Sequence, residues 1–316
     1  MDVVEQAQRF ADEVLFPAAL ATDAADAVPR ELLDGLAAAG LYGIGVDADF
    51  ATVCAVQEAL ASGCLTTAFV WAQHLGLVHA LAGAEEPLRR HWLEPLLRGD
   101  VRAGLALGGA LPQPTLRARR DGESWVLDGV SPFLSGWGLI DVVHTAARAP
   151  DDEIVWLIVD AEESGALSVE RLRLVALDAT ATVRATFGGL RVPAERQTAR
   201  HAAGGGTPPE VLRLHASLAL GVVSRCCRLL GPSKLDAERD TLRERLDALG
   251  PETAAHRAAA GELAARSAAA LAAATGSRSV LQADHAQRLW REALFVLVYA
   301  LRPPSRDALL VRLGAS

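Results

Sequence analysis

The sequence predicts an α+β fold that is mostly helical, with an N-terminal helical bundle, a central antiparallel β-domain and a C-terminal helical bundle. Apolar residues recur at helical spacing from residue 2 to about residue 100. The period changes to two between about 101 and 198, and helical spacing returns after Pro208-Pro209. We therefore expect three domains, covering residues 1–100, 101–200 and 207–316.

Composition and charge exclude several classes of protein. The 316 residues are 51% hydrophobic and 22% charged, which is enough to bury a sizeable core and argues against disorder. A net charge of −8 argues against a nucleic-acid partner. Residues 293–301 form an apolar run far shorter than the ~20 residues of a membrane span, and no signal peptide is visible. We expect a cytoplasmic protein without a membrane partner.

The first hundred residues predict a helical bundle. Pro29 stands where a helix favours proline in its first turn, and leucines on one face follow it. Further helices are expected at residues 50–62 and 64–82, and the second of these is apolar nearly all round, which places it at the centre. The amphipathic segment 86–98 closes the region.

The middle of the chain predicts short strands. Residues 124–127 alternate in a strand pattern and lead into Asp128-Gly129, a dipeptide typical of a hairpin turn. Three further strands are expected at residues 141–147, 154–159 and 180–187. Short strands joined by turns indicate a small antiparallel barrel or sandwich.

The last third predicts a second bundle after a flexible linker. Residues 202–207 contain three consecutive glycines that lack the GxGxxG spacing of a nucleotide-binding turn, so they indicate a linker. Helices are expected at residues 209–230, 235–249, 252–274 and 281–300, with a short one at 305–313.

Neither cysteines nor histidines predict a metal site. The four cysteines lie within apolar helical patterns and form no CxxC motif, which indicates buried thiols. His74 and His79 are five residues apart on an apolar helix, a spacing that does not align two ligands. We expect core or interface histidines and no bound metal.

The densest candidate site lies at residues 131–138, a strand end that combines aromatic, hydroxyl and glycine residues. A flat aromatic ligand could stack on Phe133 or Trp137 while the Ser135 hydroxyl or a backbone amide at Gly136 bonds its polar edge. The alternative is an ordinary turn lined by aromatic side chains, which a short motif alone does not exclude.

Several segments carry the motifs of one known family in their order and spacing. They lie at residues 10–17, 29–32, 36–43, 83–86, 92–100, WVLDG at 125–129, FGGLRVPAE at 187–195 and QRLWREA at 287–293. Over almost its full length the chain resembles the acyl-CoA dehydrogenase family. That resemblance implies FAD between the β-domain and the C-terminal bundle, and an acyl thioester substrate carried by CoA or a carrier protein.

The resemblance also implies roles for particular residues. Phe133 would lie on the flavin and Ser135 would bond its ring, with Gly136 and Trp137 beside them. In the family's reaction a carboxylate removes a proton next to the thioester carbonyl while the flavin accepts a hydride from the neighbouring carbon. Such a weak carbon acid requires a positioned base with a raised pKa.

The sequence departs from the family at that base. The family's usual glutamate follows a tyrosine, and here Tyr299 is followed by Ala300, which cannot accept a proton. Some members carry the glutamate on the first helix of the C-terminal bundle, so Glu210 is the candidate catalytic residue. A glutamate there also stabilises the helix dipole without any catalytic role. The resemblance therefore implies a divergent, shortened member that lacks the usual catalytic glutamate.

Three functions remain open at this point. The first is a flavoprotein oxidoreductase acting on the CH–CH group of an acyl thioester. The second is a flavin-dependent monooxygenase-like enzyme, and the third is a non-catalytic subunit or scaffold that pairs with an active homologue. In each case we expect a homodimer or a hetero-oligomer with a homologous subunit, because apolar residues crowd the C-terminal end at Trp290, Phe295, Val296 and Val298.

Overall fold

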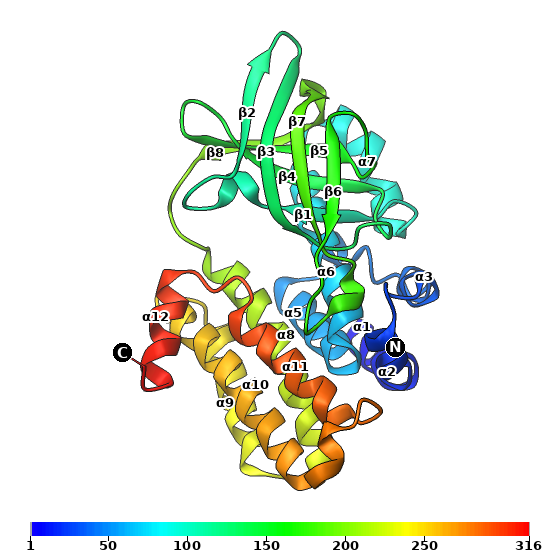
Figure 1. Ribbon diagram of the computed structural model, residues 1–316, viewed down its shortest axis with the longest axis vertical. Helices are drawn as coiled ribbons and strands as arrows, with labels where there is room; N and C mark the ends of the chain where they lie inside the picture. Colours follow the sequence, from blue (N-terminus) through cyan, green and yellow to red (C-terminus); the bar gives the residue numbers. More distant parts are fainter. Residues whose placement is uncertain (1, 316) are drawn as a thin grey trace.

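The computed structural model describes residues 2–315, and Figure 1 shows one β-sheet set above two groups of helices. The helices from the two ends of the chain pack against each other below the sheet. This arrangement confirms the mostly helical α+β fold class. None of the helices within residues 2–315 is both long enough and apolar enough to reach across a membrane.

The N-terminal helices surround α6, which is buried at their centre. They are α1 (Val3–Phe10), the π-helical turn η1 (Ala11–Leu15), α2 (Phe16–Ala24), α3 (Arg30–Ala38), α4 (Ile44–Asp47), α5 (Phe50–Gly63), α6 (Leu65–Ala82) and α7 (Glu86–Arg98). Asp49 caps α5 by accepting a hydrogen bond from the Thr52 amide at 2.8 Å. Trp71 of α6 is fully buried and donates its indole N–H to the Leu41 carbonyl at 3.1 Å. The all-round apolar pattern of α6 thus matches its central position.

The β-domain is a single sheet of eight strands. They are β1 (Ala103–Ala106), β2 (Leu116–Asp121), β3 (Ser124–Leu134), β4 (Val142–Arg148), β5 (Glu153–Asp160), β6 (Leu167–Arg171), β7 (Val183–Pro193) and β8 (Gln197–Ala202). The order across the sheet is β6-β7-β3-β2-β4-β5-β8, and β1 pairs with β4.

Most strand pairings are antiparallel, as the sequence predicted, but β4 runs parallel to both β1 and β2. In the β1–β4 pairing, Ala103 lies opposite Val142. Alternation of apolar and polar residues fixes which face of a sheet each side chain takes, but not the direction of the neighbouring strand. The sheet is therefore mixed.

The predicted hairpin turn at Asp128-Gly129 is wrong. The turn joining β2 to β3 lies at Gly122-Glu123, between the paired residues Asp121 and Ser124. Asp128 and Gly129 instead lie inside β3, where the register to β7 shifts. A Cβ atom on Gly129 would meet the Thr115 carbonyl oxygen at 2.2 Å, and its φ is +123°. Glycine is required there by a close backbone approach rather than by a turn.

The C-terminal bundle begins after the glycine linker. Its helices are α8 (Pro209–Leu230), α9 (Lys234–Asp247), α10 (Thr253–Thr275), α11 (His285–Val298) and α12 (Pro303–Arg312). Ser233 and Asp236 form a capping box at the start of α9. The bundle packs around α10, which contacts α8, α9, α11 and α12, and α8 also contacts α5 and α6 of the N-terminal region.

The contact between α5 and α8 depends on a glycine. A Cβ atom on Gly221 of α8 would lie 2.6 Å from both the Ala61 Cβ atom and the Glu58 carbonyl oxygen of α5. The two helices therefore approach closely only because position 221 has no side chain. Arg225, one turn later, donates to the Ser62 carbonyl at 2.6 Å and extends the contact.

We expect Gly221→Ala to destabilise the protein by about 1–3 kcal/mol, because the added methyl group overpacks the α5–α8 contact. The free energy of unfolding from urea titration measures this. Gly76→Ala is the matched control, since Gly76 is an exposed helix-interior glycine whose added Cβ meets only Leu105 Cδ1 at 4.0 Å. The control should gain about 0.5–1 kcal/mol. Equal effects of the two changes would contradict the close approach.

Candidate functional site

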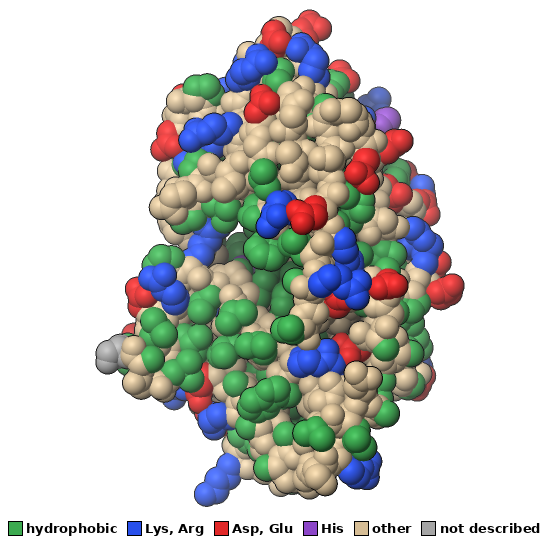
Figure 2. Space-filling model, viewed as in Figure 1, with side chains coloured by type: hydrophobic (Ala, Val, Ile, Leu, Met, Phe, Trp, Pro, Cys, Tyr) green, Lys and Arg blue, Asp and Glu red, His purple; other side chains and the backbone are tan. Residues whose placement is uncertain are grey.

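A cleft separates the β-domain from the C-terminal helices, and Figure 2 shows hydrophobic side chains along its lower wall. Strand β3 carries the predicted site and ends on the side of the sheet that faces the helices (Figure 1). The Phe133 ring is 64% exposed, whereas its neighbour Leu134 is buried in the sheet core. Alternation along β3 thus turns Phe133 away from the core.

Ser135 belongs to a chain of buried hydroxyl groups. Its Oγ lies 2.8 Å from Thr182 Oγ1, and Thr182 Oγ1 lies 2.8 Å from Thr180 Oγ1. Thr180 donates its hydroxyl hydrogen to the Leu177 carbonyl at 2.7 Å. Each hydroxyl has one hydrogen, so Thr182 donates to Thr180 and Ser135 donates to Thr182.

This chain determines what Ser135 can offer a ligand. With its one hydrogen directed to Thr182, the Ser135 oxygen keeps lone pairs that can accept a further hydrogen bond. Reversing the chain would sacrifice the bond from Thr180 to Leu177, a cost of about 0.5–1.5 kcal/mol. The Ser135 hydroxyl therefore favours a ligand N–H or O–H group over a ligand acceptor.

The turn that follows Ser135 is held by the backbone. The Gly136 amide donates to the Thr180 carbonyl at 2.7 Å, and both Gly136 and Gly138 have positive φ values, +90° and +79°. Trp137, between them, is half-buried and packs against the sheet core. The structure thus holds Phe133, Ser135, Gly136 and Trp137 in one short segment, with Phe133 as its exposed ring.

The two candidate base positions lie on different elements. Glu210 is exposed in the first turn of α8, and Ala300 follows α11 with a left-handed φ of +50°. Tyr299, before Ala300, lies in a group of aromatic rings, with centroids 4.9 Å from Phe69 and 5.4 Å from Phe295. Tyr299 lies beside α6 and α8, and Ala300 is exposed at the edge of this aromatic group.

His215 completes the group around Tyr299, and sequence reasoning did not find it. The His215 ring lies 5.0 Å from the Tyr299 ring, centroid to centroid, and its buried Nδ1 has no hydrogen-bond partner within residues 2–315. Burial, together with charge repulsion from Arg257 and Arg302, lowers the pKa of His215 to about 3. The only signal in the sequence was a polar residue on the apolar face of α8.

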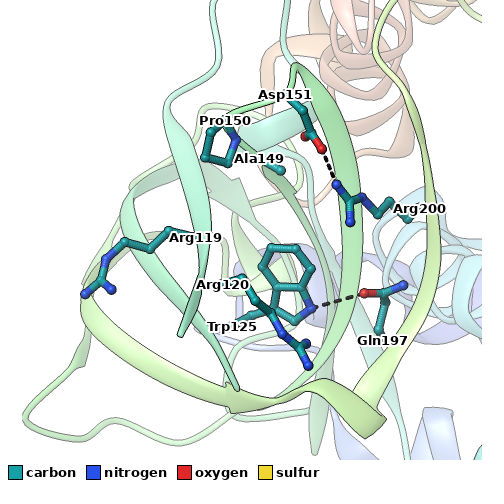
Figure 3. Close-up of a pocket in the computed structure, with 8 residues that line it drawn as sticks. All are labelled: Arg119, Arg120, Trp125, Ala149, Pro150, Asp151, Gln197 and Arg200. Atoms are coloured by element: carbon teal, nitrogen blue, oxygen red, sulfur yellow. Dashed lines mark hydrogen bonds and ion pairs between the residues drawn. The ribbon is translucent and has the colours of Figure 1, made fainter. Parts of the chain in front are cut away.

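A second hollow, of about 530 Å³, lies on the β-domain between β2, β8 and the loop after β4 (Figure 3). Trp125 forms its floor and donates its indole N–H to Gln197 at 3.1 Å, with Arg120 5.5 Å above the ring. Arg200 pairs with Asp151 at its edge, whereas Arg119 points away from the hollow (Figure 3). None of the residues predicted from the sequence lines it.

The cysteines and histidines behave as structural residues. All four cysteines are buried and unpaired, and burial raises the pKa of the Cys54 thiol to about 11. His74 is buried and its Nδ1 accepts a hydrogen bond from the Ala103 amide at 3.1 Å, which confirms a core histidine. No group of three potential ligands that could hold a metal ion occurs within residues 2–315.

Comparison with known proteins relates the N-terminal region to a known family. Residues 1–100 match the family model of the acyl-CoA dehydrogenase N-terminal domain. The long-chain specific acyl-CoA dehydrogenase of Sus scrofa mitochondria is 26% identical over 210 residues, covering 60% of this chain. That match spans about half, 49%, of the relative's own length.

Solved structures match the fold over nearly the whole chain. Butyryl-CoA dehydrogenase from Megasphaera elsdenii superposes with a TM-score of 0.81 at 17% identity, covering 99% of this chain and 97% of that one. A glutaryl-CoA dehydrogenase from Mycobacterium smegmatis in complex with FADH2 gives 0.80 at 18% identity, covering 100% and 94%. Residues 1–100 thus match the N-terminal domain of acyl-CoA dehydrogenases, and the whole chain shares the fold of these solved enzymes.

We expect stability to fall as the pH drops below 6.5, because His215 stays neutral when folded and binds a proton when unfolded. His215 alone should lower the free energy of unfolding by about 1.4 kcal/mol per pH unit as the pH falls from 6.5 towards 3. Urea titrations at pH 7 and 5 should show a smaller loss in His215→Gln. The exposed His79→Gln is the control. An unchanged pH dependence in His215→Gln would contradict a buried neutral imidazole. His74, His144 and His285, whose pKa values burial also lowers, add to the slope.

Proposed function

We propose that this protein binds FAD and acts as an oxidoreductase on the CH–CH group of an acyl thioester. The observation that carries the proposal is the Phe133 ring, 64% exposed at the end of β3 and next to a glycine-rich turn. An exposed ring there fits the face of a flat cofactor. Relatives support this, since one solved structure of the fold contains FADH2 and another, of PigA, contains FAD.

The residues of the segment fit a flavin in three ways. Phe133 offers an apolar face, and the Ser135 oxygen can accept from an N–H group of the ring. Gly138 is exposed and a Cβ atom there would meet nothing within 4 Å, so its backbone can approach a ligand closely. Bound FAD would supply the hydride acceptor that these side chains cannot provide.

Proton removal is assigned to Glu210 in this proposal. Ala300 cannot accept a proton, and Glu210 is the carboxylate near the family's second base position. Its exposed place in the first turn of α8 means that a bound substrate would have to exclude water around it to raise its basicity.

A second candidate is a non-catalytic subunit that pairs with an active homologue. The observation that favours it is Ala300 itself, which stands directly after Tyr299 without any carboxylate in the turn that follows α11. A monooxygenase-like flavin enzyme would also tolerate alanine there, because oxygen activation needs no carboxylate to remove a carbon-bound proton. These three functions differ in measurable properties.

The first test is flavin binding. The purified chain with added FAD should show flavin absorption bands at near-stoichiometric occupancy. Phe133→Ala should weaken FAD binding about tenfold, since stacking on an aromatic ring contributes about 0.5–1.5 kcal/mol beyond burial. Phe50→Ala is the control, because Phe50 is also exposed but begins α5. Absence of bound flavin in excess FAD would sink both oxidoreductase functions for the isolated chain.

The same protein with bound FAD tests whether Glu210 acts as the base. Anaerobic addition of acyl thioesters should bleach the flavin bands, and Glu210→Gln should slow bleaching at least about 100-fold, the usual contribution of a general base. Bound flavin without bleaching by any thioester would favour the non-catalytic or monooxygenase-like function. Oxygen consumption with reduced flavin then separates those two.

We further propose that the protein assembles through α11. Trp290, Leu294 and Val298 are 47%, 43% and 56% exposed and recur every four residues along one face of the helix. Figure 2 shows hydrophobic side chains gathered over the C-terminal helices on this face. Val296, which the sequence placed in this surface, is instead fully buried, because it lies on the opposite face of α11.

Sedimentation velocity at micromolar concentration should therefore show a dimer. Leu294→Lys should weaken self-association at least about tenfold by placing a charge in an apolar interface. Val46→Lys, at an exposed apolar position of α4, should leave it unchanged. A strict monomer in the unmodified protein would contradict assembly through this face.

A further inference from the structure

Six arginines are buried within residues 2–315, and five of them have an acidic partner. The five pairs are Arg102–Asp34, Arg148–Asp152, Arg213–Asp247, Arg225–Asp12 and Arg288–Glu292. Arg257 is the exception, because it is 2% exposed and forms no ion pair with any residue from 2 to 315. The positive charge of Arg257 therefore has no acidic partner among these residues, whereas each of the other five buried guanidinium groups has one.

Within residues 2–315, Arg257 makes its hydrogen bonds to backbone carbonyls alone. Its Nη2 donates to the carbonyls of Val296 at 2.7 Å and Tyr299 at 3.0 Å, at the C-terminal end of α11. The negative end of a helix dipole offsets part of a positive charge but not all of it. Burial lowers the pKa of Arg257 only to about 10, so the side chain stays cationic at neutral pH.

A second guanidinium approaches the same place from the next loop. Arg302 is half-buried and donates from Nη1 to the Ala110 carbonyl of the β-domain at 3.2 Å, which spans the two walls of the cleft. It forms no ion pair within the part of the chain that the structure describes. His215 lies against Tyr299 from the α8 side with its Nδ1 unpartnered, and both arginines act on it.

We propose that the end of the cleft beside Tyr299 is an anion site, and that it takes a carboxylate group of the ligand. Arg302 makes the direct contact, because its half-buried guanidinium keeps donors that Ala110 does not use. Arg257 acts through its field, since its Nη1 lies between α10 and α11, next to Gly261. The positive charge acts over several ångströms in such a poorly hydrated region.

The walls favour a carboxylate on an apolar chain over a phosphate. The partly buried rings of Phe295 and Tyr299 stack with centroids 5.4 Å apart, so the site joins an aromatic wall to a single planar guanidinium. One guanidinium matches the two oxygens of a carboxylate, whereas a phosphate dianion needs more donors. The proposal deepens the proposed function, because the carboxylate would belong to the acyl substrate. Its test nevertheless requires no flavin.

The test compares butyrate with butyramide, which have nearly the same shape and differ in charge. Titration calorimetry on the unmodified protein should show butyrate binding about tenfold or more tightly, as expected for a charge-assisted hydrogen bond. Arg302→Gln should abolish this preference while keeping an N–H donor for Ala110. Arg306→Gln, an exposed arginine on α12 that contacts Asp307, should retain it.

Equal affinity for butyrate and butyramide in the unmodified protein would overturn the proposal, as would a preference that survives in Arg302→Gln. If Arg302→Gln does not fold, Arg302→Lys supplies the comparison. The ammonium group should keep part of the preference, because it retains the charge but not the planar fork. A protein that prefers butyrate but binds no FAD would refute the flavin proposal and leave the anion site intact.

Discussion

The close approach of α8 to α5 is the constraint on which the remaining structure depends. Gly221 lets the two backbones meet, and α8 then serves as the axis against which α9, α10 and α11 pack. The same helix carries Glu210 at its exposed start and His215 one turn and a half later, against Tyr299. The positions of Glu210 and His215 therefore depend on the close contact that Gly221 allows between α8 and α5.

Ion pairs join the helical layers that this contact brings together. Asp12 of the N-terminal π-helical turn receives both Arg225 and Arg228 of α8. Arg291 of α11 pairs with Asp23 of α2 and also donates to the Val175 carbonyl of the β-domain at 3.2 Å. Breaking a buried pair leaves one charge stranded, so such pairs specify how the three parts of the chain meet even where their net contribution to stability is small.

Much of the fold could be predicted from the sequence, because the helical and alternating patterns report burial directly. The position of the turn between β2 and β3 could not be predicted. The chain has two Asp-Gly dipeptides near β3, at Asp121-Gly122 and Asp128-Gly129, and a dipeptide alone does not distinguish a turn from a glycine that lets two backbones approach. The Phe133 segment is local and was visible in the sequence. The convergence of His215 and Arg257 is tertiary, arising from helices whose faces only packing can bring together.

That convergence changes the electrostatics of the position where the family usually carries a base. A carboxylate after Tyr299 would face Arg257 and Arg302 and be held strongly ionised, which would weaken it as a base. With Ala300 there instead, neither guanidinium group has an acidic partner within residues 2–315. In the proposed anion site the two guanidinium groups hold a ligand carboxylate, and the proposed proton removal is assigned to Glu210 at the start of α8.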